Sequence, residues 1–301
     1  MSDKIIFSLY SNKRVAQKVA KKLGAELGEV FFDHFADGEL LVKTLSSVTD
    51  KDVIVIESTA KKAHERLFEL LLLIDSIKRG SPKSIKLYVP YFGYSRQERV
   101  SWINEPISCE VVAKILDTTK VDEILTFDIH HPDIRYFFET KFKSIPTTSL
   151  FGKYYRNYLK QHKINPCDVR IVSPDHGSNV RADALVKEIT GSKKVILSKH
   201  RPAPNYVEYL DVEANDVKGK VCIIIDDIID TGGTIISASE LLLKQGASSV
   251  LVGASHAVLS KNSVKRLLKS HISDFAVTNT IERKLPKSIK ILDISSLIKI
   301  N

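Results

Sequence analysis

Short β-branched runs alternate with amphipathic helical patterns along the whole chain, and this alternation limits the possible folds more than any other feature. Each run is four to six residues long and is followed by a turn or helix signal. Such a rhythm is typical of parallel sheets covered by helices on both faces. The sequence therefore predicts an α/β fold, with strands at 4–8, 53–57, 85–90, 123–128, 170–173, 195–198, 221–225 and 249–254.

A weak internal repeat predicts two similar domains, each a mainly parallel sheet flanked by helices. The segment KDVIVIEST from residue 51, a helix and SIKLYVPYF resemble GKVCIIIDDIIDTGGT from residue 219, a helix and SSVLVGASHAV. The chain has 301 residues, which suits two units of about 150. We expect domains over 1–147 and 148–286; the final segment 287–301 could pack on the first. The generic similarity of any two strand-helix-strand units remains an alternative explanation.

Composition and charge exclude several classes of protein. Hydrophobic residues make up 43% and charged residues 27%, as in globular proteins. The amino terminus is too charged for a secretory signal, and we expect no membrane span. Three separated cysteines predict neither disulfides nor zinc, which favours the cytoplasm. A net charge of +9 fits either a nucleic-acid-binding surface or an enzyme that acts on anionic phosphates. The lysines are scattered along the chain, so we favour the enzyme and expect no nucleic-acid partner.

The segment 221–234 carries the strongest chemical signal. An apolar strand ends in Asp226 and Asp227, which are costly inside a buried sheet and are therefore expected at its carboxyl end, facing polar ligands. The following Thr-Gly-Gly-Thr opens a helix, whose first backbone amides and hydroxyls can hold a phosphate. A turn capped by Asp230 is the simpler alternative, but it leaves the acid pair and both glycines unexplained.

Other polar positions are ambiguous when taken alone. Asp128 and His130, two residues apart at a strand end, are expected on one side and could share a Mg²⁺ ion, although histidine is an unusual Mg²⁺ ligand. Asp175 could be a helix cap. The tripeptide 37–39 reads as an exposed turn. Lys199 and Arg201 lie in a proline-rich segment without periodicity, which predicts a mobile basic loop.

Six motifs together resemble ribose-phosphate diphosphokinases, which have the type I phosphoribosyltransferase fold. These are FADGEL (35–40), YFGYSRQE (91–98), TFDIHH (126–131), VSPDHG (172–177), SKHRP (198–202) and DDIIDTGGT (226–234). The resemblance covers nearly the whole chain. It implies transfer of the β,γ-diphosphate of ATP to the C1 hydroxyl of ribose 5-phosphate, giving 5-phosphoribosyl 1-diphosphate and AMP for nucleotide biosynthesis.

The resemblance also implies roles for individual residues. Its metal ligands match His130 and Asp175, with Mg²⁺ as the cofactor, and Asp128 is the further candidate from its spacing. The catalytic cations match Lys199 and Arg201 on a closing flap. ATP-site residues match Phe35, Asp37, Gly38, Glu39, Arg96 and Gln97. The ribose 5-phosphate site matches Asp226, Asp227, Asp230, Thr231, Gly232, Gly233 and Thr234.

Assembly and departures from the family pattern complete the expectations. The resemblance implies a homo-oligomer, a dimer or hexamer, in which a neighbour can lend Arg96 and Gln97 to the nucleotide pocket. Ser178 replaces a usual glycine, His131 a small residue, and Thr49 an arginine. The Thr49 change puts regulation by ADP and phosphate in doubt. A catalytically silent paralogue and an ordinary phosphoribosyltransferase are the rival hypotheses.

Overall fold

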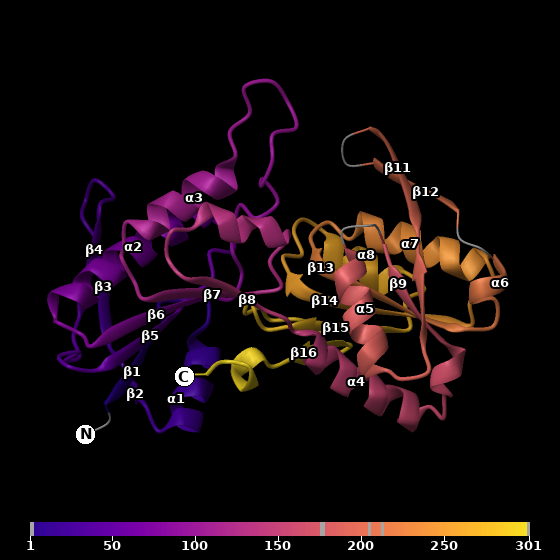
Figure 1. Ribbon diagram of the computed structural model, residues 1–301, viewed down its shortest axis with the longest axis horizontal. Helices are drawn as coiled ribbons and strands as arrows, with labels where there is room; N and C mark the ends of the chain where they lie inside the picture. Colours follow the sequence, from indigo (N-terminus) through magenta and orange to yellow (C-terminus); the bar gives the residue numbers. More distant parts are fainter. Residues whose placement is uncertain (1–2, 175–177, 204–205, 212–213, 300–301) are drawn as a thin grey trace. The chain divides into compact units, whose positions relative to one another are not determined.

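A computed structural model describes residues 3–174, 178–203, 206–211 and 214–299. The chain divides into two compact units (Figure 1). The first comprises residues 1–145, 280–282 and 294–301, and the second comprises residues 146–279 and 283–293. No helix among the described residues is long and apolar enough to cross a membrane.

The first unit is built on a six-stranded sheet in the order β2-β1-β5-β6-β7-β8, and every pair of neighbours is parallel. A separate antiparallel hairpin is formed by β3 and β4. The elements are β1 (Lys4–Phe7), α1 (Lys13–Leu23), β2 (Glu26–Leu27), β3 (Val30–His34), β4 (Leu40–Thr44), β5 (Asp52–Ile56), α2 (Ala63–Arg79), β6 (Ser84–Val89), α3 (Ser108–Asp117), β7 (Glu123–Phe127), η1 (Pro132–Phe137) and β8 (Phe142–Ile145).

The second unit repeats this plan with a parallel sheet in the order β10-β9-β13-β14-β15-β16 and a hairpin of β11 and β12. Its elements are α4 (Thr148–Gln161), η2 (Pro166–Asp168), β9 (Val169–Ser173), α5 (Asn179–Glu188), β10 (Lys193–Ile196), β11 (Ser198–Ala203), β12 (Tyr206–Asp211), α6 (Ala214–Val217), β13 (Val221–Ile229), α7 (Gly233–Lys244), β14 (Ser249–Ala257), α8 (Ser263–Lys269), β15 (Asp274–Thr278) and β16 (Ile289–Leu292).

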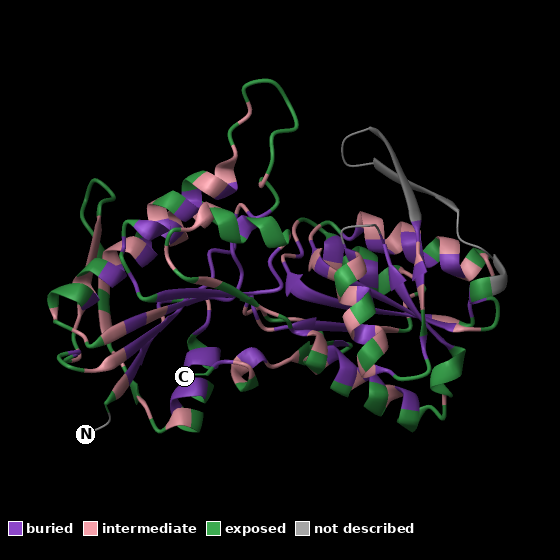
Figure 2. Cartoon of the chain, in the orientation of Figure 1, coloured by how far each residue is buried: buried purple, intermediate pink, exposed green. Residues whose placement is uncertain are grey.

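Apolar residues on both faces of the second sheet are buried under helices. Ile235, Ala238 and Leu242, spaced along one side of α7, pack with Cys222 and Ile224 of β13 on one face. Residues of α4 and α5 cover the other face, where they meet the alternate residues of β13. Figure 2 shows these strands as a buried layer between partly exposed helices. The predicted α/β fold with helices on both faces is therefore confirmed, as is the duplication of one domain type.

The carboxyl-terminal segment is divided between the two units. Strand β16 pairs with β15 and extends the second sheet. Residues 294–301, including η4 (Ile294–Ser296), belong to the first unit, as do residues 280–282. The segment 287–301 thus does not pack as one piece on the first unit, because the pattern of Ile289–Leu292 continues the sheet of the second.

Candidate functional site

The two adjacent acids of the second unit lie on a longer strand than the sequence predicts. The sequence suggests that the strand ends at residue 225, whereas β13 runs from Val221 to Ile229. Its pairing with β9 stops at Ile224, but its pairing with β14 continues past both acids, with Asp226 opposite Ala254. Asp226 and Asp227 therefore lie inside the strand, beyond the last partner on β9.

The start of α5 provides polar partners for these acids. The Ser178 hydroxyl donates a hydrogen bond of 2.8 Å to Oδ1 of Asp226. Asp227 is only 4% exposed, and its Oδ2 lies 3.5 Å from a guanidinium nitrogen of Arg181. Asp226 is half-buried, so part of its carboxylate stays within reach of a ligand. Ser178, a departure from the family pattern, thus supplies a hydroxyl that glycine could not.

The loop after β13 leads directly into the start of α7. Gly232 occupies the N-cap position in a left-handed conformation, with φ of 77°, and has no side chain that could cap the helix. The N-cap residue is therefore Gly232 and not Asp230, the residue that the simpler alternative places there. Backbone amides at a helix start carry a partial positive charge and bind anions, and Thr231 and Thr234 add hydroxyls at either side. Arg266 of α8, which sequence reasoning missed, donates to the Thr231 carbonyl at 3.4 Å.

The first unit places two expected sites after neighbouring strands. Arg96 and Gln97 follow β6, whereas Asp128 and His130 follow β7, its neighbour in the sheet. The side-chain carbonyl oxygen of Gln97 accepts a 2.7 Å hydrogen bond from the Ser108 hydroxyl. Arg96 is exposed. Because carboxyl ends of parallel strands meet at one edge, these four residues belong to the same edge of the first sheet.

The backbone at Asp128 departs from the extended form that the sequence argument assumed. Strand β7 ends at Phe127, and Asp128 has φ of 35°, a left-handed conformation that is uncommon outside glycine. The alternation that placed Asp128 and His130 on one side therefore does not extend to them. Asp128 is 9% exposed and His130 is half-buried. Strained backbone of this kind concentrates at functional positions.

No group of three or more potential metal ligands is assembled within the described part of the chain. Asp175, the third residue expected at the metal, lies outside the described residues. The predicted metal site therefore stays a prediction.

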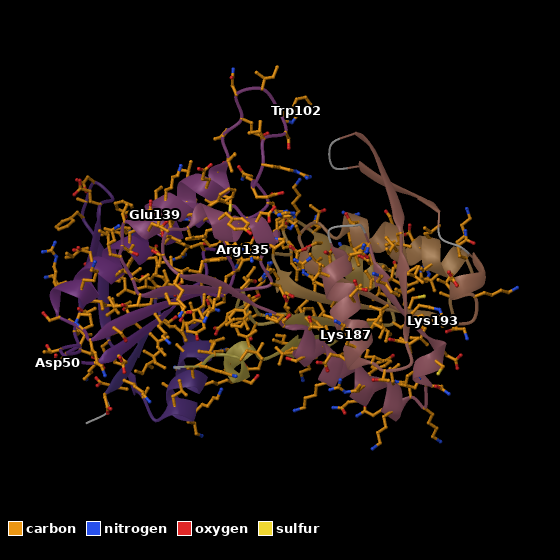
Figure 3. All side chains as sticks on the ribbon, viewed as in Figure 1. Asp50, Trp102, Arg135, Glu139, Lys187 and Lys193 are labelled. Atoms are coloured by element: carbon orange, nitrogen blue, oxygen red, sulfur yellow. The ribbon has the colours of Figure 1, made fainter. Side chains whose placement is uncertain are left out.

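Phe35, Asp37, Gly38 and Glu39 form the turn between β3 and β4. The Glu39 amide donates to Oδ1 of Asp37 at 3.1 Å, and Gly38 has φ of 94°. The Phe35 ring is 54% exposed at this turn. The hairpin stands apart from the loop that carries Trp102, which continues from Arg96 and Gln97 (Figure 3). Within one copy of the first unit, the expected adenine-site residues thus come from two separate segments.

Lys199 and Arg201 lie on a hairpin strand, where the sequence predicted a loop without regular structure. Both belong to β11, which pairs antiparallel with β12, and Lys199 lies opposite Tyr209. The register shifts twice, between Ser198 and Lys199 and between His200 and Ala203. The alternating residues of YVEYLD provide the partner strand that the proline-rich segment alone does not reveal.

Comparison with known proteins relates both halves of the chain to one family. Residues 4–119 match the N-terminal domain of ribose phosphate pyrophosphokinase, and residues 160–300 match the phosphoribosyl synthetase-associated domain. Ribose-phosphate pyrophosphokinase 1 of Listeria monocytogenes is 38% identical over 97% of this chain and 91% of the relative. The Bacillus caldolyticus ribose-phosphate pyrophosphokinase is 38% identical over 95% and 90% of the two chains.

A solved structure extends the similarity to three dimensions. Phosphoribosylpyrophosphate synthetase from Mycobacterium smegmatis superimposes with a TM-score of 0.87 and 32% identity. The match covers 98% of this chain and 96% of that one. The similarity therefore includes both units and the segments that carry the sequence motifs.

We predict that Gly232→Ala lowers the free energy of unfolding by about 1–2 kcal/mol, since an alanine at positive φ is strained. Its Cβ would also lie 3.2 Å from Cγ of Leu267. Gly233→Ala is the matched control, because that residue is helical and an added Cβ meets only Oγ1 of Thr231, at 3.8 Å. Urea denaturation without ligands compares the two, and equal loss in both variants would contradict the prediction.

Proposed function

The chain belongs to the ribose-phosphate pyrophosphokinase family, and from this premise we propose which of its residues carry the reaction. The enzyme transfers the β,γ-diphosphate of ATP to the C1 hydroxyl of ribose 5-phosphate. A bond forms between the C1 oxygen and the β-phosphorus, the bond from that phosphorus to the α-phosphate oxygen breaks, and AMP leaves. The hydroxyl proton is released, and no residue is assigned as its base.

Ribose 5-phosphate binds at the end of β13 in this proposal. The observation that carries it is the start of α7, where the N-cap residue is a left-handed Gly232 without a side chain and the preceding strand carries the half-buried Asp226. The 5-phosphate lies against the amides of Gly233 and Thr234, with the side chains of Thr231 and Thr234 as further donors. Asp230 lies at the entrance of this loop and helps to hold its shape.

The two acids have different tasks. Asp226 accepts hydrogen bonds from the ribose hydroxyls, because it is half-buried where Asp227 is only 4% exposed and a carboxylate can accept several donors. Asp227 is too buried to meet a sugar directly and sits beside Arg181. It orients the loop and balances the charge of the guanidinium.

ATP binds through the edge of the first unit that carries Arg96 and Gln97, while an exposed Phe35 supplies a face on which adenine can stack. Asp37, Gly38 and Glu39 at the same turn hydrogen-bond the base. Because one copy carries these groups on separate segments, we propose a homo-oligomer in which a neighbour completes the pocket. The enzyme works in the cytoplasm, consistent with three unpaired cysteines.

Mg²⁺ is the divalent metal of this proposal. The carboxylates of Asp128 and Asp175 are hard oxygen donors that suit it, and the ATP phosphates complete the shell. His130 is the third residue that contacts the ion in this proposal. When bound, the ion neutralises phosphate charge. Lys199 and Arg201 on the β11–β12 hairpin add positive charge to the transferring diphosphate in the transition state.

We predict that the protein, mixed with Mg²⁺, ATP and ribose 5-phosphate, releases AMP and 5-phosphoribosyl 1-diphosphate in equal amounts. Nucleotide chromatography and ³¹P NMR measure both products. Release of ADP instead would mean transfer of the γ-phosphate alone. Absence of any product from the folded protein would favour a catalytically silent paralogue.

We also predict that Asp226→Asn and Lys199→Ala fail differently. The first variant should bind ribose 5-phosphate about tenfold or more weakly, because it loses a charged acceptor for sugar hydroxyls. The second should lower kcat with little change in sugar binding, since its charge acts in the transition state. Steady-state kinetics and calorimetry separate the two effects, and equal loss of sugar affinity in both would show the division of roles to be wrong.

A further inference from the structure

Glu57 of the first unit occupies the position that Asp226 occupies in the second. On one face of each sheet, Val53 and Val55 of β5 correspond to Cys222 and Ile224 of β13, since each pair packs against the long helix that follows. Two residues beyond Val55 is Glu57, and two beyond Ile224 is Asp226. The pairing with the neighbouring strand agrees, because Phe7 lies opposite Val55 and Val172 lies opposite Ile224.

The loop after β1 surrounds the Glu57 carboxylate with donors. The Leu9 amide donates to Oε2 at 2.9 Å, and the Ser11 amide donates to Oε1 at 2.8 Å. The Tyr10 amide points at both oxygens, at 3.3 and 3.4 Å, and the Ser8 hydroxyl lies 3.2 Å from Oε2. Successive amides converging on one anion form a nest of the kind that binds phosphate groups.

The carboxylate is held inside the protein. Glu57 is 0% exposed, whereas Asp226 is half-buried and its Oδ1 accepts from the Ser178 hydroxyl and the Asp227 amide. Burial raises the pKa of Glu57, and the hydrogen bonds from Ser11, Leu9 and Ser8 oppose that rise.

The same loop continues into a second set of buried contacts. Asn12, which precedes α1, accepts a hydrogen bond from the Ser58 amide at 2.9 Å and donates to the Thr280 carbonyl at 3.2 Å. The Ser58 hydroxyl donates to the same carbonyl at 2.5 Å. The Glu57 carboxylate and these contacts therefore fix both ends of the segment 8–12 against β5 and the segment 280–282.

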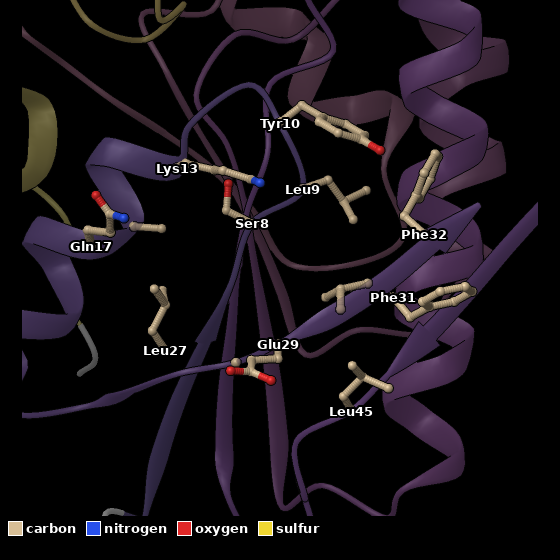
Figure 4. A pocket seen from close by; sticks show the side chains of 13 residues that line it. Ser8, Leu9, Tyr10, Lys13, Gln17, Leu27, Glu29, Phe31, Phe32 and Leu45 are labelled. Atoms are coloured by element: carbon tan, nitrogen blue, oxygen red, sulfur yellow. The ribbon is translucent and has the colours of Figure 1, made fainter.

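We propose that the loop 8–11 is an anion-binding site whose permanent occupant is the chain's own Glu57. The ligand class is a small oxyanion, a carboxylate or a phosphate. Since Glu57 fills the site, the first unit has no place there for a sugar phosphate. The occupied loop also forms one wall of a hollow of about 570 Å³ lined by Ser8, Leu9, Tyr10 and Lys13 (Figure 4).

The test is chemical rescue of Glu57→Ala by formate. The substitution removes the carboxylate and leaves its donors and its space, so formate should raise the melting temperature of this variant by about 4 °C or more. Chloride at equal ionic strength and wild-type protein with formate are the reference measurements. Phosphate is a second probe. The relevant quantity is the rise in melting temperature of Glu57→Ala beyond the rise in wild type, because the proposed function gives wild type a phosphate site at the start of α7.

Two variants serve as controls. Glu69→Ala removes another buried acid, 5% exposed and paired with Arg66 at 2.6 Å, without emptying an amide nest. Glu57→Gln keeps the volume but turns an NH₂ group toward amide donors, so neither variant should respond to formate. If Glu57→Ala is recovered only unfolded, its refolding yield in formate against chloride gives the same comparison.

Rescue confined to Glu57→Ala supports the proposal. Equal effects of formate on all variants, or no effect on Glu57→Ala, would overturn it. The experiment measures stability and not activity, so its outcome is independent of the catalytic roles proposed for the second unit.

Discussion

Central strands of a parallel sheet are covered on both faces, so a carboxylate on such a strand costs several kcal/mol unless polar partners surround it. Both units place an acid at this costly position and at the same edge, where a neighbouring strand has ended. Asp226 accepts from the Ser178 hydroxyl and the Asp227 amide and is half-buried, whereas Glu57 is fully buried and accepts from the amides of residues 9–11 and the Ser8 hydroxyl. The acid of the first unit is thus fully enclosed, while the acid of the second remains partly exposed.

The duplicated architecture can therefore divide the work of a two-substrate enzyme. The two sheets share one strand order, yet only the second follows its acid with Thr-Gly-Gly-Thr at the start of a helix. In the first unit β5 ends at Ile56, and the chain continues past Glu57 to Ser58, which is hydrogen-bonded to Asn12 and Thr280. Side chains of the first unit thus fill the edge beside β5. In the proposed function, the nucleotide and the metal therefore bind at the ends of the neighbouring strands β6 and β7.

Much of the fold could be predicted from sequence, because apolar runs with turn signals mark buried parallel strands directly. The repeat was also visible, since β5-α2-β6 and β13-α7-β14 kept their patterns. Local sequence patterns failed where the extent of a strand depends on the strand that pairs with it. Strand β13 extends beyond Asp227 because β14 continues beside it, and β11 exists because β12 pairs with it. Sequence analysis missed Glu57 because its equivalence to Asp226 depends on the strand register. The alignment of the internal repeat by sequence differs from that register by one residue. Ser178 and Arg181 gain meaning only once α5 is seen beside β13.

The central claim is that a sugar phosphate binds where β13 leads into α7. A crystal structure of the protein soaked with ribose 5-phosphate tests it most directly. The account predicts the 5-phosphate within hydrogen-bond distance of the Gly233 and Thr234 amides, with ribose hydroxyls against Asp226, and no sugar at the loop 8–11. Density for the sugar elsewhere, with the start of α7 vacant or blocked, would contradict it.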